Sequence, residues 1–289
     1  MNGLAMGMVY ALIVMGLVLL IRAVGILNFA QGDILSVGAF IGCSMLIDLK
    51  LPLWLAVIVS LALYLLVGLI FMACVYWPVR KSSYSAAIVI STMGASVVIR
   101  ELLMIIWGSD PRTMPAVIQG TSGNGRSMLL TIGDAQISVQ YFVVFIVGVL
   151  AILLTFTLFE KLYAGRIMQA ASQNQFAAQL IGIPVFLTIA ATYMISFALA
   201  STAGFLIGPL FNVSVSLSQL QMYAFAGLVI GGLGNIKGAI IGALMVGLLE
   251  SFVTVLVYSY APAVVFGVLI LFLLFKPDGL FKSTIGVKV

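Results

Sequence analysis

Long apolar runs, separated by short polar segments, follow one another along almost the whole chain of 289 residues. A helix needs about 20 apolar residues to cross the hydrocarbon core of a bilayer. The first run has neither a basic start nor a small-residue cleavage site, so we expect a retained span rather than a signal peptide. The pattern predicts spans at 3–21, 33–49, 53–77, 86–107, 140–159, 185–208, 221–235, 238–257 and 262–276. The expected fold is all-α: a single transmembrane domain over 1–289, built as a polytopic membrane helix bundle of eight or nine segments.

Two polar interruptions predict broken helices, near 28–33 and near 231–238. The first, LNFAQGD, separates two apolar runs with the residues Asn28, Gln31, Gly32 and Asp33. One interpretation is that Asp33 caps the helix that follows. The other is that the break lines or gates the inner part of a cavity between two subunits, because freed backbone groups at membrane depth must face protein or water.

The second interruption, GGLGNIKGAIIG, combines closely spaced glycines with Asn235. Its weak similarity to the first break, with Gly238 matching Gly32, hints that the two breaks face each other. The seventh run, 221–235, is too short to cross comfortably. It either joins the eighth run as one kinked element or forms a half-helix packed against protein. Glycines four residues apart elsewhere predict tight helix packing.

Two loops are long enough to extend beyond the membrane, at 108–139 and at 160–184. In the first, Gly133-Asp134 between two β-prone runs predicts a small hairpin. Orientation follows from the basic residues, which are retained on the cytoplasmic side. That rule places 108–139 outside, 160–184 inside and the C-terminus inside, from Arg80, Lys81, Lys161, Arg166, Lys276, Lys282 and Lys288.

Charged residues within apolar runs are candidates for function. Glu250 lies well inside the eighth run, and it is either an acceptor at a helix interface or a carboxylate that lines the path. Arg100 and Glu101 lie in the fourth run, seven and six residues before its end. Arg100 either has a function there or extends its head group toward the outer interface.

The inner loop predicts a helix from Arg166 to Ile181, which Gly182 and Pro184 end. Its apolar residues do not form a broad face, so this helix need not lie in lipid. Two interpretations stay open: a short amphipathic connector on the membrane surface, or a helix to which a cytoplasmic partner docks.

The composition excludes several classes of function. The chain is 63% hydrophobic and 7% charged, and it contains no histidine. The phosphate-binding pattern G-x-x-x-x-G-K-[ST] occurs nowhere, so ATP-driven activity would need another polypeptide. Neither a metal-binding cluster nor a nucleophile beside a base is present, so we expect no catalytic residue, metal or cofactor. Transport remains, with a self-sufficient channel or secondary carrier, or a structural membrane scaffold, as alternatives.

Several motifs in order resemble the permease subunits of branched-chain amino acid ABC importers. They are GLAMGMVYALIVMGLVLLIRAVGILNFAQGDILSVGAFIG, GRIMQAASQNQFAAQLIGIPV, FALASTAGFLIG, GLGNIKGAIIGALMVGLLES and GVLILFLLFKPDGLF. The resemblance covers nearly the whole chain. It implies a second permease subunit, homologous or identical, together with cytoplasmic ATP-binding subunits and an external solute-binding protein. It also implies an amino-acid substrate, a lipid environment in the inner membrane of a bacterium or archaeon, and no nucleic-acid partner.

The resemblance also assigns the inner loop to coupling with the ATPase. The residues implied are Gly165, Arg166, Ala170, Gln173, Asn174, Ala177, Ala178, Leu180 and Gly182. Gln173 and Asn174 stand where many relatives carry acids, which predicts weaker long-range steering of the ATPase. Asn28, Gln31, Gly32, Asp33, Asn235 and Glu250 are the candidates for the translocation path. The family also includes permeases for urea, amides and other small polar solutes, and related sugar permeases are a further alternative, so the motifs leave the solute open.

Overall fold

A computed structural model describes residues 1–25, 27–80, 82, 85–118, 127–132, 135–173, 175–277 and 279–281. Each of the nine predicted runs contains a helix. These are α1 (Asn2–Val24), α2 (Gln31–Ile47), α3 (Leu53–Phe71), α5 (Ser85–Trp107), α6 (Val139–Glu160), α9 (Val185–Ile207), α10 (Leu220–Gly231), α11 (Ile236–Leu256) and α12 (Ala261–Phe275). Within the described residues, six helices are long and apolar enough to cross a membrane, and three apolar helices are shorter. The predicted polytopic helical fold is confirmed.

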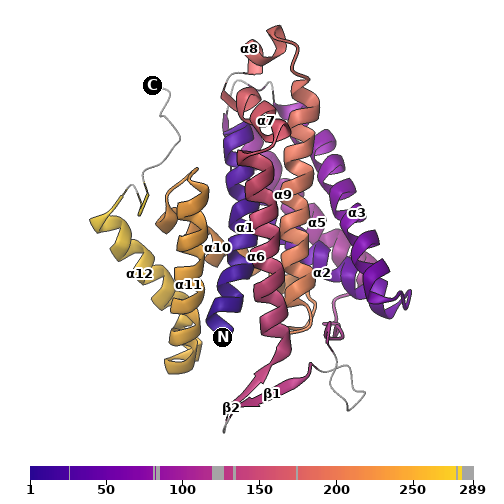
Figure 1. The fold of residues 1–289 in the computed structure, drawn as a ribbon, viewed down its shortest axis with the longest axis vertical. Coiled ribbons are helices and arrows are strands. Elements are labelled where there is room, and N and C mark those ends of the chain that lie inside the picture. Colours follow the sequence, from indigo (N-terminus) through magenta and orange to yellow (C-terminus); the bar gives the residue numbers. More distant parts are fainter. Residues whose placement is uncertain are drawn as a thin grey trace.

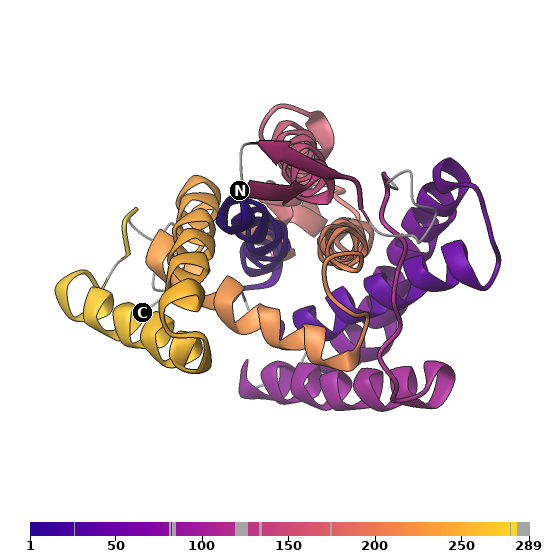
Figure 2. The same ribbon diagram turned by 90° about the horizontal axis from the view of Figure 1, so that it is seen from below.

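Helix α1 forms the centre of the molecule. It is apolar on all sides, and 94% of its most apolar stretch is buried, as expected of a helix that has no polar face. It packs against α6, α9 and α11. Figure 2 looks along α1, α6 and α9, which are seen end-on, whereas α5, α10 and α12 are seen from the side.

Small residues allow the closest helix contacts, as the glycine spacing predicted. A Cβ on Gly204 of α9 would lie 1.9 Å from the Leu35 carbonyl oxygen of α2. A Cβ on Gly231 of α10 would lie 2.2 Å from the Gly238 carbonyl oxygen of α11. Both pairs of helices therefore approach to backbone contact, which side chains larger than glycine would prevent.

The seventh and eighth runs form an antiparallel pair rather than one kinked element. Gly227 meets Ala243, and Gly231 meets Gly238, so the two helices run past each other in opposite directions. Gly232 and Gly234 take positive φ angles of 104° and 83° in the connection, a conformation that glycine adopts without a steric cost. The half-helix interpretation of α10 is thus correct.

The two ends of the molecule carry different segments (Figure 1). One end holds the N-terminus and an antiparallel hairpin of β1 (Leu129–Ile132) and β2 (Ala135–Ser138), in which Leu129 lies opposite Ser138. This confirms the predicted hairpin, although Gly133 and Asp134 lie outside the described residues. The other end holds α7 (Tyr163–Gln173) and α8 (Gln175–Leu180).

Two elements differ from the prediction. The third run continues beyond α3 through a π-helical turn, η1 (Met72–Tyr76), into the short α4 (Trp77–Val79). The inner loop does not form one helix over 166–181. It forms α7 and α8, with Asn174 outside the described residues. The predicted stop is correct, because Gly182 has a φ of 84° and the Ile183 amide donates to the Ala178 carbonyl at 2.9 Å.

Candidate functional site

The first break lies between the end of α1 and the start of α2, and its polar side chains are buried. Gly25, with a φ of 79°, ends α1, and its amide donates to the Ile21 carbonyl. The side chains that interrupt the apolar pattern face protein in this conformation: Asn28 is 3% exposed, Gln31 0% and Asp33 1%. Buried polar groups require partners, and the neighbouring helices supply them.

Asn28 forms a hydrogen bond within the break, and Gln31 connects the break to two long helices. Asn28 Oδ1 accepts a hydrogen bond from the Ala30 amide at 3.1 Å. Gln31 Nε2 donates to the Ser196 carbonyl and hydroxyl oxygens of α9, at 3.2 and 3.1 Å. The Ser196 hydroxyl in turn donates to the Gly16 carbonyl oxygen of α1 at 2.9 Å. The break is thereby linked to both α1 and α9.

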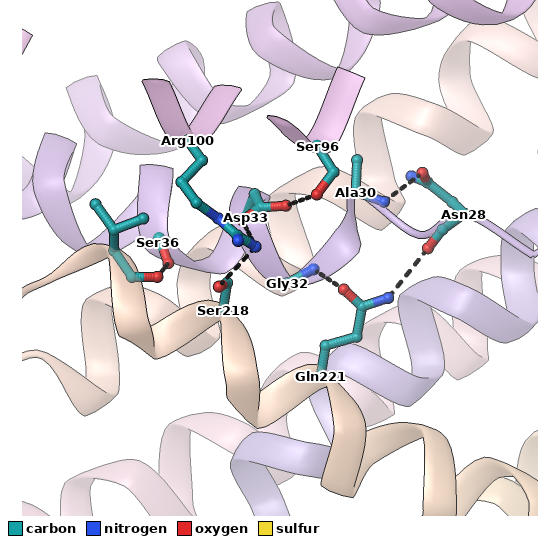
Figure 3. A network of polar contacts seen from close by, with 10 residues as sticks. Asn28, Ala30, Gly32, Asp33, Ser36, Ser96, Arg100, Ser218 and Gln221 are labelled. Atoms are coloured by element: carbon teal, nitrogen blue, oxygen red, sulfur yellow. Dashed lines mark hydrogen bonds and ion pairs between the residues drawn. The ribbon is translucent and has the colours of Figure 1, made fainter. Parts of the chain in front are cut away.

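Gln221, in the first turn of α10, joins both sides of the break (Figure 3). Its Oε1 accepts a hydrogen bond from the Gly32 amide at 2.5 Å, and its Nε2 donates to the Asn28 carbonyl oxygen at 3.4 Å. A Cβ on Gly32 would lie 2.6 Å from the same Oε1 atom. Glycine at this position therefore permits the close approach of Gln221.

Asp33 does not cap α2, contrary to the capping interpretation. It lies in the third position of the helix, and α2 has no side-chain cap. Its Oδ2 accepts a hydrogen bond from the Ser96 hydroxyl of α5, and its Oδ1 forms an ion pair with Arg100 at 3.2 Å (Figure 3). Arg100 Nη2 also donates to Ser218 Oγ at 3.4 Å. Arg100 therefore turns toward α2 rather than along α5 to the interface.

The second break is held by one cap and one basic side chain. Asn235 Oδ1 accepts a hydrogen bond from the Gly238 amide at 3.1 Å, which caps α11. Arg22, near the end of α1, donates from Nε to the Gly234 carbonyl oxygen at 2.8 Å. The end of the helix that leads into the first break thus contacts the second break.

Glu250 of α11 is partly buried and accepts a hydrogen bond from the Tyr10 hydroxyl of α1. Tyr10 is fully buried, and its ring stacks on Tyr223 of α10 with centroids 5.7 Å apart. The structure therefore bears out the acceptor at a helix interface. It does not bring Glu250 together with the residues of the first break.

The predicted coupling residues divide into exposed and packed groups. Arg166, Gln173, Ala177, Leu180 and Gly182 are exposed, and Ala170 is intermediate. Gly165 and Ala178 are buried, and a Cβ on Gly165 would lie 2.3 Å from the Leu158 carbonyl oxygen of α6. These two positions hold the segment against the bundle.

The break and the ion pair are also contacted by neutral polar residues that the sequence analysis did not single out. Ser96 and Ser218 contact the ion pair, while Ser196 and Gln221 contact the break. Each lies in or beside an apolar helix, where a hydroxyl or amide must find an internal partner. A single hydroxyl or amide side chain within an apolar run is therefore the sequence signal that could have identified these residues.

Comparison with known proteins identifies the family. Residues 1–274 match the family described as the permease component of branched-chain amino acid transport systems. The LivH permease protein of the high-affinity branched-chain amino acid transport system of Escherichia coli K12 is 31% identical over 295 residues, which cover 96% of this chain and 93% of LivH.

Two further relatives extend the comparison. BraD of Pseudomonas aeruginosa, a permease protein of the same kind of system, is 31% identical over 291 residues, with 96% of this chain and 93% of BraD covered. The fructose import permease protein FruF of Bifidobacterium longum is 27% identical over 279 residues, with 91% of this chain and 72% of FruF covered. The apolar helices and these relatives indicate a multi-pass protein of the plasma membrane. The chain therefore belongs to the permease family of branched-chain amino acid transport systems.

Proposed function

We propose that this chain is the transmembrane permease subunit of an ATP-driven importer that translocates branched-chain or similar amino acids. The observation that carries this proposal is the family match over residues 1–274, together with 31% identity to LivH and BraD over 96% of the chain. An external binding protein delivers the amino acid, and a second permease subunit, homologous or identical, completes the pathway.

Separate cytoplasmic subunits hydrolyse the ATP, because the sequence has no phosphate-binding loop. The contact surface for them is the segment α7–α8, which caps the end of the molecule opposite the hairpin (Figure 1). Large apolar side chains are exposed on and beside it: Leu162 at 54%, Tyr163 at 78%, Leu180 at 73% and Ile181 at 75%. Large apolar side chains exposed on a polar segment favour a protein partner.

Within this segment the exposed residues contact the ATPase and the buried residues preserve the shape. Met168 and Ala171 are 8% and 3% exposed, and Gln169 Nε2 donates to the Phe159 carbonyl oxygen at 2.6 Å. One face of α7 thus packs on protein rather than lying on a membrane surface. Movements of a bound ATPase then reach α1, α6 and α9, which α7 contacts.

The first break gates the pathway in this proposal. The residues Asn28, Gln31, Gly32 and Asp33 join α2 to α1, α5, α9 and α10 through hydrogen bonds. A rearrangement of these helices must therefore break these hydrogen bonds and form others in their place. Asn235 and Glu250 take part through the second break and the α1–α11 interface.

The test is co-purification with the ATPase subunits followed by an assay of ATP hydrolysis. Leu180→Glu places a charge on the exposed tip, and we expect a folded permease that no longer retains the ATPase. Leu129→Glu is the matched control, because Leu129 is 53% exposed on the hairpin at the opposite end. Retention of the ATPase by Leu180→Glu, or its loss in both variants, would contradict the assignment of α7–α8 as the docking segment.

A further inference from the structure

The C-terminal end of α10 carries four backbone carbonyls that have no partner within the helix, as in every α-helix. Those of Leu228 and Val229 both accept a hydrogen bond from the Gly232 amide, at 3.0 and 3.3 Å. The other two belong to Ile230 and Gly231, which are both buried. A buried carbonyl costs free energy unless a donor meets it, so these two need donors from another segment.

The segment after α12 supplies both donors. The chain turns at Gly279, which has a φ of 79°. The Leu280 amide then donates to the Ile230 carbonyl oxygen at 2.8 Å. The Phe281 amide donates to the Gly231 carbonyl oxygen at 3.3 Å. Residues 279–281, which we call the strap, thus complete the end of α10.

The strap lies against the second break. A Cβ on Gly279 would lie 2.7 Å from the Gly232 Cα atom, and a Cβ on Gly238 would lie 2.8 Å from the Phe281 ring. Gly279 is buried, whereas Phe281 is 39% exposed. Two hydrogen bonds to α10 and this close contact hold the strap, so it can detach without the unfolding of a helix.

Helix α10 connects the strap to the first break. Gln221, in the first turn of α10, accepts from the Gly32 amide and donates to the Asn28 carbonyl oxygen. The strap holds the last turn, which ends ten positions further along the helix, about 15 Å at 1.5 Å per residue. A helix of 12 residues carries a displacement from one end to the other. The position of the strap therefore affects the bonds that Gln221 makes.

We propose that the strap is a conformational restraint on the first break. It holds α10, and with it Gln221, in the position that keeps Asn28 and Gln31 buried, and it detaches when α10 moves during transport. Detachment removes the donors of two buried carbonyls, so the strapped arrangement is the favoured one at rest. The proposal rests on the proposed function, since it takes the first break to be the gate.

Hydrogen exchange in the complete complex with its ATPases tests the detachment. The amides of Leu280 and Phe281 should exchange slowly without nucleotide, because both are hydrogen-bonded, and faster when ATP is bound. The amides in the middle of α1 are the control, because this helix is buried and should stay protected throughout. Slow exchange of the strap in every nucleotide state, or fast exchange at rest, would overturn the proposal.

Proline substitutions test the restraint, because proline has no amide hydrogen to donate. Leu280→Pro and Phe281→Pro are compared with Leu280→Ala and Phe281→Ala, which shorten the same side chains and keep the amides. Each is combined with Ala30→Cys in a background without Cys43 and Cys74. Ala30 lies in the first break and is fully buried. Complex yield and the rate of reaction with a small water-soluble thiol reagent are measured without nucleotide.

We expect each proline variant to assemble, and the cysteine at position 30 to react roughly fivefold faster or more than in the matching alanine variant, because the strapped arrangement has lost a hydrogen bond. Equal rates in the proline and alanine variants would overturn the proposal and leave the strap as packing alone. Failure of both proline variants to assemble would overturn it in favour of a role in folding. Reaction in the proline variants, but none in the chain with the native strap when ATP is bound, would support the restraint and count against the gate of the proposed function.

Discussion

At the residue scale, the hydrogen bond between Tyr10 and Glu250 predicts a difference between two substitutions. Glu250→Leu leaves the buried Tyr10 hydroxyl without its acceptor, which costs about 1–3 kcal/mol. Glu250→Gln keeps an acceptor oxygen at the same place. We expect the thermal unfolding midpoint of the purified complex to fall for the leucine variant and to stay near the native value for the glutamine variant.

The control for this prediction is the same pair of substitutions in a Tyr10→Phe background. Without the Tyr10 hydroxyl, Glu250→Leu should lower the thermal unfolding midpoint much less than it does in the native background. Equal midpoints for both variants in the native background would show that the bond does not stabilise the protein. Leucine uptake by the glutamine variant separates the two interpretations of Glu250. Reduced uptake with intact assembly favours a carboxylate in the path, and native uptake favours a role at the helix interface alone.

Gly204 gives a second prediction at the residue scale. Its Cβ position lies 1.9 Å from the Leu35 carbonyl oxygen, so Gly204→Ala pushes α9 away from α2. Overpacking of this kind typically costs about 1–3 kcal/mol. Gly94→Ala in α5 is the control, because nothing lies within 4 Å of its Cβ position. Denaturation of both variants in detergent should show a lower free energy of unfolding for Gly204→Ala and an unchanged one for Gly94→Ala. Equal stability of the two variants would contradict the packing argument.

The partners of individual side chains were the least predictable feature. The sequence identified Asp33 as part of a polar interruption and Arg100 as a charge within an apolar run, but 67 positions separate them. A local rule therefore offered a helix cap as one of the two interpretations of Asp33. The structure places Asp33 in the first turn of α2, beyond the N-cap position, where Ser96 and Arg100 of α5 contact it. Local patterns cannot supply such long-range contacts.

At the scale of elements, the first break predicts a change in accessibility. Cysteines at positions 28 and 31, in a background without Cys43 and Cys74, should not react with a small water-soluble thiol reagent at rest, because Asn28 and Gln31 are buried. The reaction should begin when ATP binds and the helices around the break rearrange. Leu129→Cys is the control, because Leu129 is 53% exposed on the hairpin at the opposite end from α7–α8 and should react throughout. Protection of both positions in every nucleotide state would exclude the break as a gate.

Most elements were predictable because lipid imposes a length on apolar helices. The runs at 86–107 and 140–159 correspond to α5 and α6 within one residue at each end. The hairpin followed from Gly133-Asp134, and the half-helix α10 packed against protein was one of two open interpretations, although its antiparallel pairing with α11 was not predicted. The π-helical turn over 72–76 was not predicted, since it lies within an uninterrupted apolar run and has no local marker.

At the scale of the whole molecule, the central claim is that this permease passes branched-chain amino acids through the membrane at the expense of ATP hydrolysed by separate subunits. The most direct measurement is leucine accumulation in liposomes that contain the permeases and the ATPases, with the binding protein on the external side. We predict accumulation that requires both the loaded binding protein and ATP on the side of α7–α8, and none from the permease alone. Accumulation without ATP or without the ATPase subunits would contradict the account and favour a channel or secondary carrier. Accumulation of a sugar or of urea in place of leucine would contradict the assigned substrate.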